Sequence, residues 1–180
     1  MSRQYDVVLL GASGFTGALT AEYLAKNAPA DLTWAVAGRN KAKLEGFGRD
    51  VLLADVTDPE SLKALAESAR IVVTTVGPYI QYGEQLVAAC VDAGTDYLDL
   101  TGESEFVDRM YVGYHERAVQ TGARVIHACG FDSIPYDLGV QYTVEQLPER
   151  VPIQVDGLIR GGGRASGGTF HTPTTPLSPA

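Results

Sequence analysis

The chain has 180 residues, of which 45% are apolar, and its formal net charge is −8 at pH 7. At this length we expect one main domain with a real hydrophobic core. The acidic balance disfavours nucleic acid as a partner. The apolar run over residues 7–11 is too short for a secretory leader or a membrane span, so we predict a cytoplasmic protein without an integral membrane segment. Peripheral association with a membrane is left open. Cys90 and Cys129 lack metal-ligand spacing, and no metal site is predicted.

Short apolar runs that suit buried strands alternate along the chain with segments of helical spacing. The expected strands are residues 5–10, 33–37, 51–54, 71–76, 96–100 and 124–128. The expected helices are residues 15–27, 41–46, 83–93 and 103–120, one that begins at Pro59 with Asp58 as its N-cap, and one that begins near Ile134. This alternation predicts an α/β fold of the Rossmann type, with a doubly wound parallel sheet and helices on both faces.

A glycine-rich turn joins the first strand to the first helix, and this context makes it a strong sign of a dinucleotide site. Gly11 allows the tight turn, Gly14 lets the backbone approach a pyrophosphate, and Gly17 lets the helix pack closely on the strand. The predicted phosphate-binding residues are Gly11, Ser13, Gly14, Phe15, Thr16 and Gly17. Backbone N–H groups of this turn lie at the positive end of the helix dipole.

The end of the second strand predicts which dinucleotide binds. An NAD site carries Asp or Glu there, whereas this chain has Arg39 and Asn40. Arg39 offers a bidentate fork for a 2′-phosphate, and we expect no acid nearby to repel that group, so NADP(H) is the predicted cofactor. Asp55 either meets the adenine edge or caps the region before the Pro59 helix.

The turn after the fourth strand, Gly77-Pro78, is expected to line the ribose and nicotinamide side of the cofactor.

No catalytic residue is identified from the sequence. A Tyr with a Lys four residues later, a nucleophile elbow and a P-loop are all missing from the sequence. Candidates at the carboxyl ends of strands are Tyr79, Tyr97, Asp99, Glu103, His127 and Asp132. Tyr79 and Asp132 are the weak candidates for the proton donor; a packing tyrosine and a helix cap are the competing interpretations. A core histidine is the expected role of His127.

Five segments occur in the same order as in a known family. They are Gly11-Ala-Ser-Gly-Phe-Thr-Gly17, Ala37-Gly-Arg-Asn40, Thr75-Val-Gly-Pro-Tyr79, Tyr97-Leu-Asp-Leu-Thr-Gly-Glu103 and Cys129-Gly-Phe-Asp-Ser-Ile-Pro135. Over residues 5–165 the chain resembles the saccharopine dehydrogenase-like oxidoreductases, and most closely their trans-acting enoyl reductase branch. The resemblance implies reduction of a carbon–carbon double bond on an acyl or polyketide chain, held by a carrier or synthase, in lipid biosynthesis.

Members of that family are longer, and the resemblance fades near Gly168. We therefore predict an NADP-binding Rossmann domain over residues 1–148, only the start of a truncated second α/β domain, for the substrate, over 149–168, and a disordered tail over 169–180. Alternation over residues 154–160 predicts a strand in the second domain. Two other functions stay open: a saccharopine-type amino-acid dehydrogenase, and a non-catalytic NADP-sensing regulator. A homo-oligomer is also left open.

Overall fold

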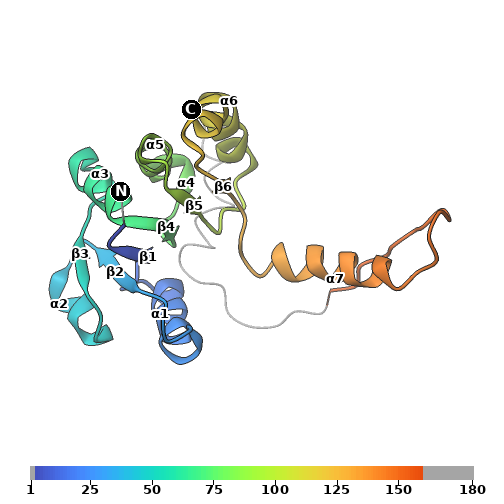
Figure 1. Ribbon diagram of the computed structural model, residues 1–180, viewed down its shortest axis with the longest axis horizontal. Helices are drawn as coiled ribbons and strands as arrows, with labels where there is room; N and C mark the ends of the chain where they lie inside the picture. Colours follow the sequence, from blue (N-terminus) through green and yellow to red (C-terminus); the bar gives the residue numbers. More distant parts are fainter. Residues whose placement is uncertain (1–2, 160–180) are drawn as a thin grey trace, which may run out of the picture.

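The computed structural model describes residues 3–159, and their core is a parallel sheet (Figure 1). Within these residues the strand order is β3-β2-β1-β4-β5-β6. The strands are β1 (Tyr5–Leu10), β2 (Trp34–Gly38), β3 (Val51–Leu53), β4 (Ala69–Thr74), β5 (Asp96–Leu98) and β6 (Val125–Ile126). Every neighbouring pair is parallel. This is the strand order of a dinucleotide-binding Rossmann sheet, so the predicted fold is confirmed.

Helices connect the strands and cover both faces of the sheet unequally. They are α1 (Phe15–Asn27), α2 (Lys41–Leu44) with a following 3-10 turn η1 (Glu45–Phe47), α3 (Pro59–Ser68), α4 (Tyr79–Tyr82), α5 (Glu84–Ala93), α6 (Ser104–Thr121) and α7 (Ile134–Glu145). As predicted, Asp58 caps α3: its carboxylate accepts the Glu60 N–H at 3.2 Å. Helices α3, α5 and α6 pack side by side on one face, while α1 lies on the other (Figure 1).

Two apolar clusters hold the layers together. The larger cluster lies between the sheet and the α3, α5 and α6 layer, and includes the fully buried Val72, Tyr97 and Phe106. The smaller cluster lies beneath α1 and includes Leu9 and Trp34. Each large side chain buried in this way contributes about 1.5–3 kcal/mol, which explains why the short strands stay paired.

The last part of the described chain departs from the prediction. No strand forms over residues 154–159; these residues are exposed and have no strand partner within residues 3–159, so the predicted strand is wrong there. Helix α7 forms near its predicted start but contains no buried residue. The predicted tail, 169–180, and residues 160–168 of the predicted 149–168 segment lie outside the described residues.

No helix within residues 3–159 is both long enough and apolar enough to cross a membrane.

Candidate functional site

The phosphate-binding turn lies where the strand order reverses. Strand β1 has β2 on one side and β4 on the other, and the chain leaves β1 through Gly11. The Gly11 N–H binds the Ala37 carbonyl at 2.9 Å, and the Thr75 N–H binds the Leu10 carbonyl at 3.0 Å. The turn is thus tied to the ends of both neighbouring strands, at the crevice where doubly wound sheets bind their ligands.

Two of the three glycines are required by contacts inside the turn. Gly11 has a φ of +90°, and a Cβ atom there would lie 2.8 Å from both the Thr75 hydroxyl and the Val76 side chain. A Cβ atom on Gly17 would lie 2.1 Å from the Gly11 carbonyl oxygen. Helix and strand therefore approach more closely than any residue with a side chain allows. This is the tight strand-to-helix packing that the sequence predicted.

The third glycine leaves the turn open to a ligand. Gly14 is exposed, and its neighbours Ser13 and Phe15 are exposed as well. As N-cap of α1, Gly14 provides no capping side chain, and the first turn holds no acidic residue. The free N–H groups and the helix dipole, equivalent to about half an elementary charge, thus face solvent at the sheet edge. An anionic pyrophosphate fits this cradle.

The adenosine end of the site contains an ion pair that sequence reasoning missed. The Arg39 Nε atom lies 4.0 Å from the Asp55 carboxylate. Arg39 follows β2 and Asp55 follows β3, and because the strands are paired through Gly38 and Leu53 their ends meet at one edge. The expectation that no acid stands near Arg39 is therefore wrong. Asn40 caps α2 by accepting the Lys43 N–H at 3.2 Å.

The Asp55 carboxylate is engaged in a local turn. It accepts the N–H of Thr57 at 2.9 Å and its hydroxyl at 2.8 Å. These hydrogen bonds, and then the charge of Arg39, hold the pKa of Asp55 below its usual value. Of the two roles left open for Asp55, this geometry favours the turn before α3, while Asp58 is the N-cap itself.

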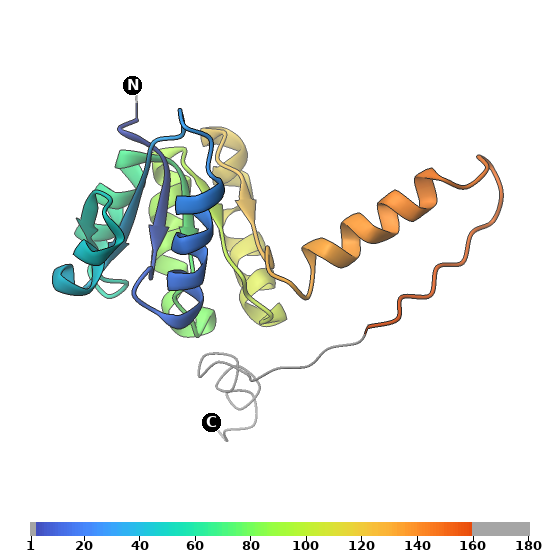
Figure 2. The same cartoon turned by 90° about the horizontal axis from the view of Figure 1, so that it is seen from below.

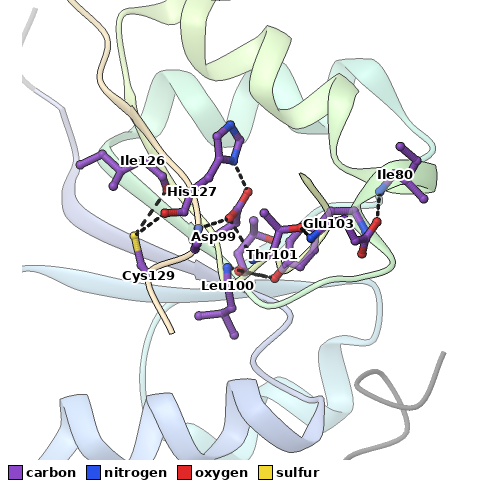
Figure 3. Close-up of polar contacts among 11 residues, drawn as sticks. Ile80, Asp99, Leu100, Thr101, Glu103, Ile126, His127 and Cys129 are labelled. Carbon is purple, nitrogen blue, oxygen red and sulfur yellow. Dashed lines mark hydrogen bonds and ion pairs between the residues drawn. The ribbon is translucent and has the colours of Figure 1, made fainter. Parts of the chain in front are cut away.

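A carboxylate holds the turn that follows β4. Both oxygens of Glu103 accept backbone N–H groups, from Tyr79 at 3.0 Å and from Ile80 at 2.7 Å (Figure 3). These are the first two N–H groups of α4, whose N-cap is Pro78 and which has no other side-chain cap. Glu103 thus fixes the Gly77-Pro78 turn at the edge of the sheet instead of presenting its carboxylate to a substrate.

Tyr79 faces the core. Its side chain is buried, its hydroxyl donates to the Thr74 carbonyl at 3.2 Å, and the Leu100 N–H approaches the same oxygen at 3.4 Å. Burial is the main reason why the pKa of Tyr79 is raised, and the charges of Asp99 and Glu103 raise it further. A hydroxyl so placed suits a structural role better than proton donation to a substrate.

Asp99 and the partly buried His127 form a pair at the ends of β5 and β6 (Figure 3). Asp99 is fully buried, and its Oδ2 atom lies 2.6 Å from His127 Nδ1. Its Oδ1 atom accepts the N–H groups of Thr101 and Ala128, both at 3.0 Å. The His127 ring packs edge-on against Phe106 at 5.3 Å between centroids. The sequence identified both residues as separate candidates and did not predict their contact. They meet because the ends of the two parallel strands are adjacent.

The remaining candidates differ in exposure. Tyr97 is buried, and within residues 3–159 its hydroxyl has no hydrogen-bond partner; burial and the nearby Asp99 charge raise its pKa. Asp132 is exposed on the loop between β6 and α7. Ser133, and not Asp132, is the N-cap of α7, and no side chain caps that helix, so the predicted capping role of Asp132 is wrong.

Known proteins resemble this chain in sequence over most of its length. It is 50% identical over 147 residues to a trans-acting enoyl reductase of Mycobacterium tuberculosis, an alignment that covers 77% of this chain and 35% of that protein. It is 44% identical over 157 residues to the trans-acting enoyl reductase of Mycobacterium ulcerans, covering 82% of this chain and 37% of that protein. The chain therefore spans about a third of the length of these curated relatives.

Solved structures share the fold. Saccharopine dehydrogenase (L-Glu forming) of Saccharomyces cerevisiae matches with a TM-score of 0.64 and 23% identity, over 78% of this chain and 31% of that one. Triphenylmethane reductase of Citrobacter sp., in complex with NADP(H), matches with a TM-score of 0.53 and 22% identity, over 68% of this chain and 48% of that one.

The family model of the saccharopine dehydrogenase NADP binding domain matches residues 7–126. This range runs from β1 to the end of β6 and contains the phosphate-binding turn, Arg39, and the turn held by Glu103. The match agrees with the open anion cradle and with the arginine at the end of β2. The chain therefore belongs to the saccharopine dehydrogenase NADP-binding domain family, as an oxidoreductase domain whose cofactor is NADP(H).

Proposed function

We propose that this chain uses NADPH to reduce the carbon–carbon double bond of an acyl or polyketide chain in lipid biosynthesis, with the substrate held by a carrier or synthase. The observation that carries the proposal is the uncapped, exposed N-terminus of α1 at the point where the strand order reverses. The names of the mycobacterial relatives supply the reaction type. Because the chain spans about a third of those proteins, their activity is proposed for it and not assumed.

Cofactor binding is assigned to the residues along the sheet edge. The N–H groups of the Gly11–Gly17 turn bind the pyrophosphate, with Ser13 and Thr16 as additional hydroxyl donors. Arg39 binds the 2′-phosphate through its guanidinium fork, in competition with its present contact to Asp55. The Gly77-Pro78 backbone lines the ribose and nicotinamide side. When bound there, NADPH supplies the hydride for the double bond.

Such a reduction requires only one proton donor from the protein, because a single proton must reach the substrate after hydride transfer. Of the two proton-donor candidates, Tyr79 is engaged with the Thr74 carbonyl. Asp132 is exposed on the loop after β6, so its side chain is accessible to a bound substrate. We therefore favour Asp132 for contact with the substrate and assign Tyr79 and Glu103 to positioning the Gly77-Pro78 turn.

The test is NADPH oxidation by the purified chain in the presence of a trans-2-enoyl thioester. We expect substrate-dependent oxidation that disappears in Gly14→Val and falls in Asp132→Asn. The matched control is Asp108→Asn, which changes an exposed aspartate on α6. Oxidation dependent on an aminoadipate semialdehyde and glutamate would instead identify an amino-acid dehydrogenase. If the chain binds NADPH tightly but neither substrate causes NADPH oxidation, the chain is not a catalyst of either reaction, and the result identifies an NADP-sensing protein.

A further inference from the structure

A cleft runs between helix α6 and the edge strand β6. We call it the edge cleft; its volume is about 530 Å³, within the roughly 300–1,000 Å³ of small-molecule sites. Met110, Ala118 and Ala123 line it and are buried, whereas Tyr111 and Val119 line it and are more than half exposed. Helix α7 contributes no residue to this cleft and extends away from the sheet (Figure 2). A concave apolar surface left open in this way is typical of a ligand site.

The side chains of the edge cleft are uncharged. Among the described residues that line it, none is Asp, Glu, Lys or Arg. The Tyr114 hydroxyl is engaged with the Glu84 carboxylate, to which it donates at 3.2 Å. The cleft on the other flank of α6 differs, because its lining includes Glu84, Asp108, Arg109 and Arg117. A hydrocarbon ligand therefore fits the edge cleft better than a phosphate or a nucleotide, whose charges would have no partner there.

The two ends of the edge cleft differ in polarity. His127 directly follows β6, and Val107 lies in the first turn of α6, so this end lies at the carboxyl edge of the sheet, where doubly wound folds bind their ligands. Asp99 contacts Nδ1 of His127 at 2.6 Å, which leaves Nε2 as the ring nitrogen for a ligand. The other end is lined by Gly122 and Ala123, which have no polar side chain. This arrangement fits a molecule with a polar head and an apolar tail.

We propose that the edge cleft binds the hydrocarbon tail of the acyl substrate, with the polar thioester end at His127 and the end of the tail toward Gly122. The inference rests on the proposed function, which supplies the acyl group. From Val107 to Gly122 the helix advances about 22 Å. An acyl chain in one leaflet of a bilayer spans roughly 15 Å, half of the hydrocarbon core, so a long chain fits lengthwise. Its reacting end then lies at the same sheet edge as the Gly77-Pro78 turn.

Calorimetric titration of the full chain with octanoate and hexadecanoate, without NADPH and below their micelle concentrations, tests the edge cleft independently of catalysis. We expect hexadecanoate to bind at least about tenfold more tightly, because each additional methylene group removes apolar area from water. Ile126→Glu, next to His127, should raise the Kd of both fatty acids by at least about tenfold. Val119→Glu, toward the other end, should raise the Kd of hexadecanoate alone.

The matched control is Val112→Glu, since Val112 is 86% exposed on α6 but does not line the edge cleft. It should leave both Kd values unchanged. The three replaced side chains are exposed, so the variants should fold, which circular dichroism checks.

Equal affinity for the two fatty acids, or a hexadecanoate Kd that Ile126→Glu and Val119→Glu leave unchanged, would overturn the proposal. A parent chain that binds neither fatty acid would also overturn it. If Leu138→Glu on α7 then bound them, α7 would be the occupant of the cleft; a dimer in light scattering that Val119→Glu dissociates would instead identify a second copy. Length-dependent binding by a chain that does not oxidise NADPH would contradict the reductase function alone. Oxidation with a short enoyl thioester but no fatty-acid binding would contradict the edge cleft alone.

Discussion

Replacing Asp99 by alanine removes the acceptors of two backbone N–H groups and the partner of a histidine in one step. Asp99 Oδ1 accepts from Thr101 and Ala128, and Oδ2 contacts His127. A buried donor without an acceptor costs about 1–3 kcal/mol, so the two N–H groups alone predict a loss of about 2–6 kcal/mol in the free energy of unfolding. This is a large part of the roughly 5–15 kcal/mol that stabilises a typical domain.

Asparagine at the same position provides the matched comparison. Its Oδ1 atom can accept both N–H groups, and its amide can donate to Nδ1 of His127 if the histidine proton lies on Nε2. We therefore expect Asp99→Asn to cost no more than about 1.5 kcal/mol, the contribution of one ordinary hydrogen bond. Asp108→Ala, on the exposed side of α6, should stay within about 0.5 kcal/mol of the parent.

Urea unfolding, followed by the fluorescence of Trp34, measures these differences; Trp34 is the one tryptophan of the chain and is buried. With a slope of about 2 kcal/mol per molar urea, the Asp99→Ala midpoint should fall by about 1–3 M. Equal midpoints for Asp99→Ala and Asp99→Asn would refute the reasoning, because the alanine variant alone leaves the two N–H groups unpaired.

Three further predictions concern the turn, the adenosine end and the effect of pH. Gly17→Ala should lower stability by about 1–3 kcal/mol in thermal unfolding, because its Cβ atom would lie 2.1 Å from the Gly11 carbonyl oxygen; an unchanged Tm would contradict the close packing. Asp55→Asn should tighten NADPH binding by about two- to fivefold in titration calorimetry and leave NADH binding unchanged, because the exposed ion pair competes only weakly for the Arg39 guanidinium; weaker NADPH binding would show that Asp55 orients the arginine beside it. Hydrogen bonds from Arg124 hold the pKa of Asp96 below its usual 3.8. The parent should therefore be more stable than Arg124→Gln at neutral pH, and this difference should disappear as the pH falls through the lowered pKa of Asp96. An equal difference at pH 2 and pH 7 would argue against the ion pair.

Local signals predicted most of the fold. The alternation of apolar runs with helical spacing identified all six strands of the described sheet, because both patterns depend on burial within a few residues of chain. Asp58 before Pro59 predicted a helix start for the same reason. The glycine turn was predictable since Gly11 and Gly17 answer requirements of the turn itself.

Contacts between segments that are distant in the sequence could not be predicted from such local patterns. The contact of Asp99 with His127 joins residues that follow neighbouring strands. The hydrogen bonds from the start of α4 to Glu103 join the ends of two separate helices. The acid beside Arg39 was missed because Asp55 lies on the next strand and not near it in sequence. The alternation over residues 154–160 misled, because alternating side chains make a strand only when a partner strand is present.

A calorimetric titration with NADPH and NADH tests whether the Gly11–Gly17 turn and Arg39 form an NADP(H) site. The parent chain should bind NADPH at least about tenfold more tightly than NADH, and Arg39→Asp should remove that preference. Gly14→Val should stay folded, since position 14 has extended backbone and its Cβ atom would meet only the Gly11 carbonyl oxygen, at 3.3 Å, but it should lose NADPH binding because the branched side chain occupies the approach of the pyrophosphate. Equal affinities for the two cofactors in the parent, or unaltered NADPH affinity in folded Gly14→Val, would contradict the account.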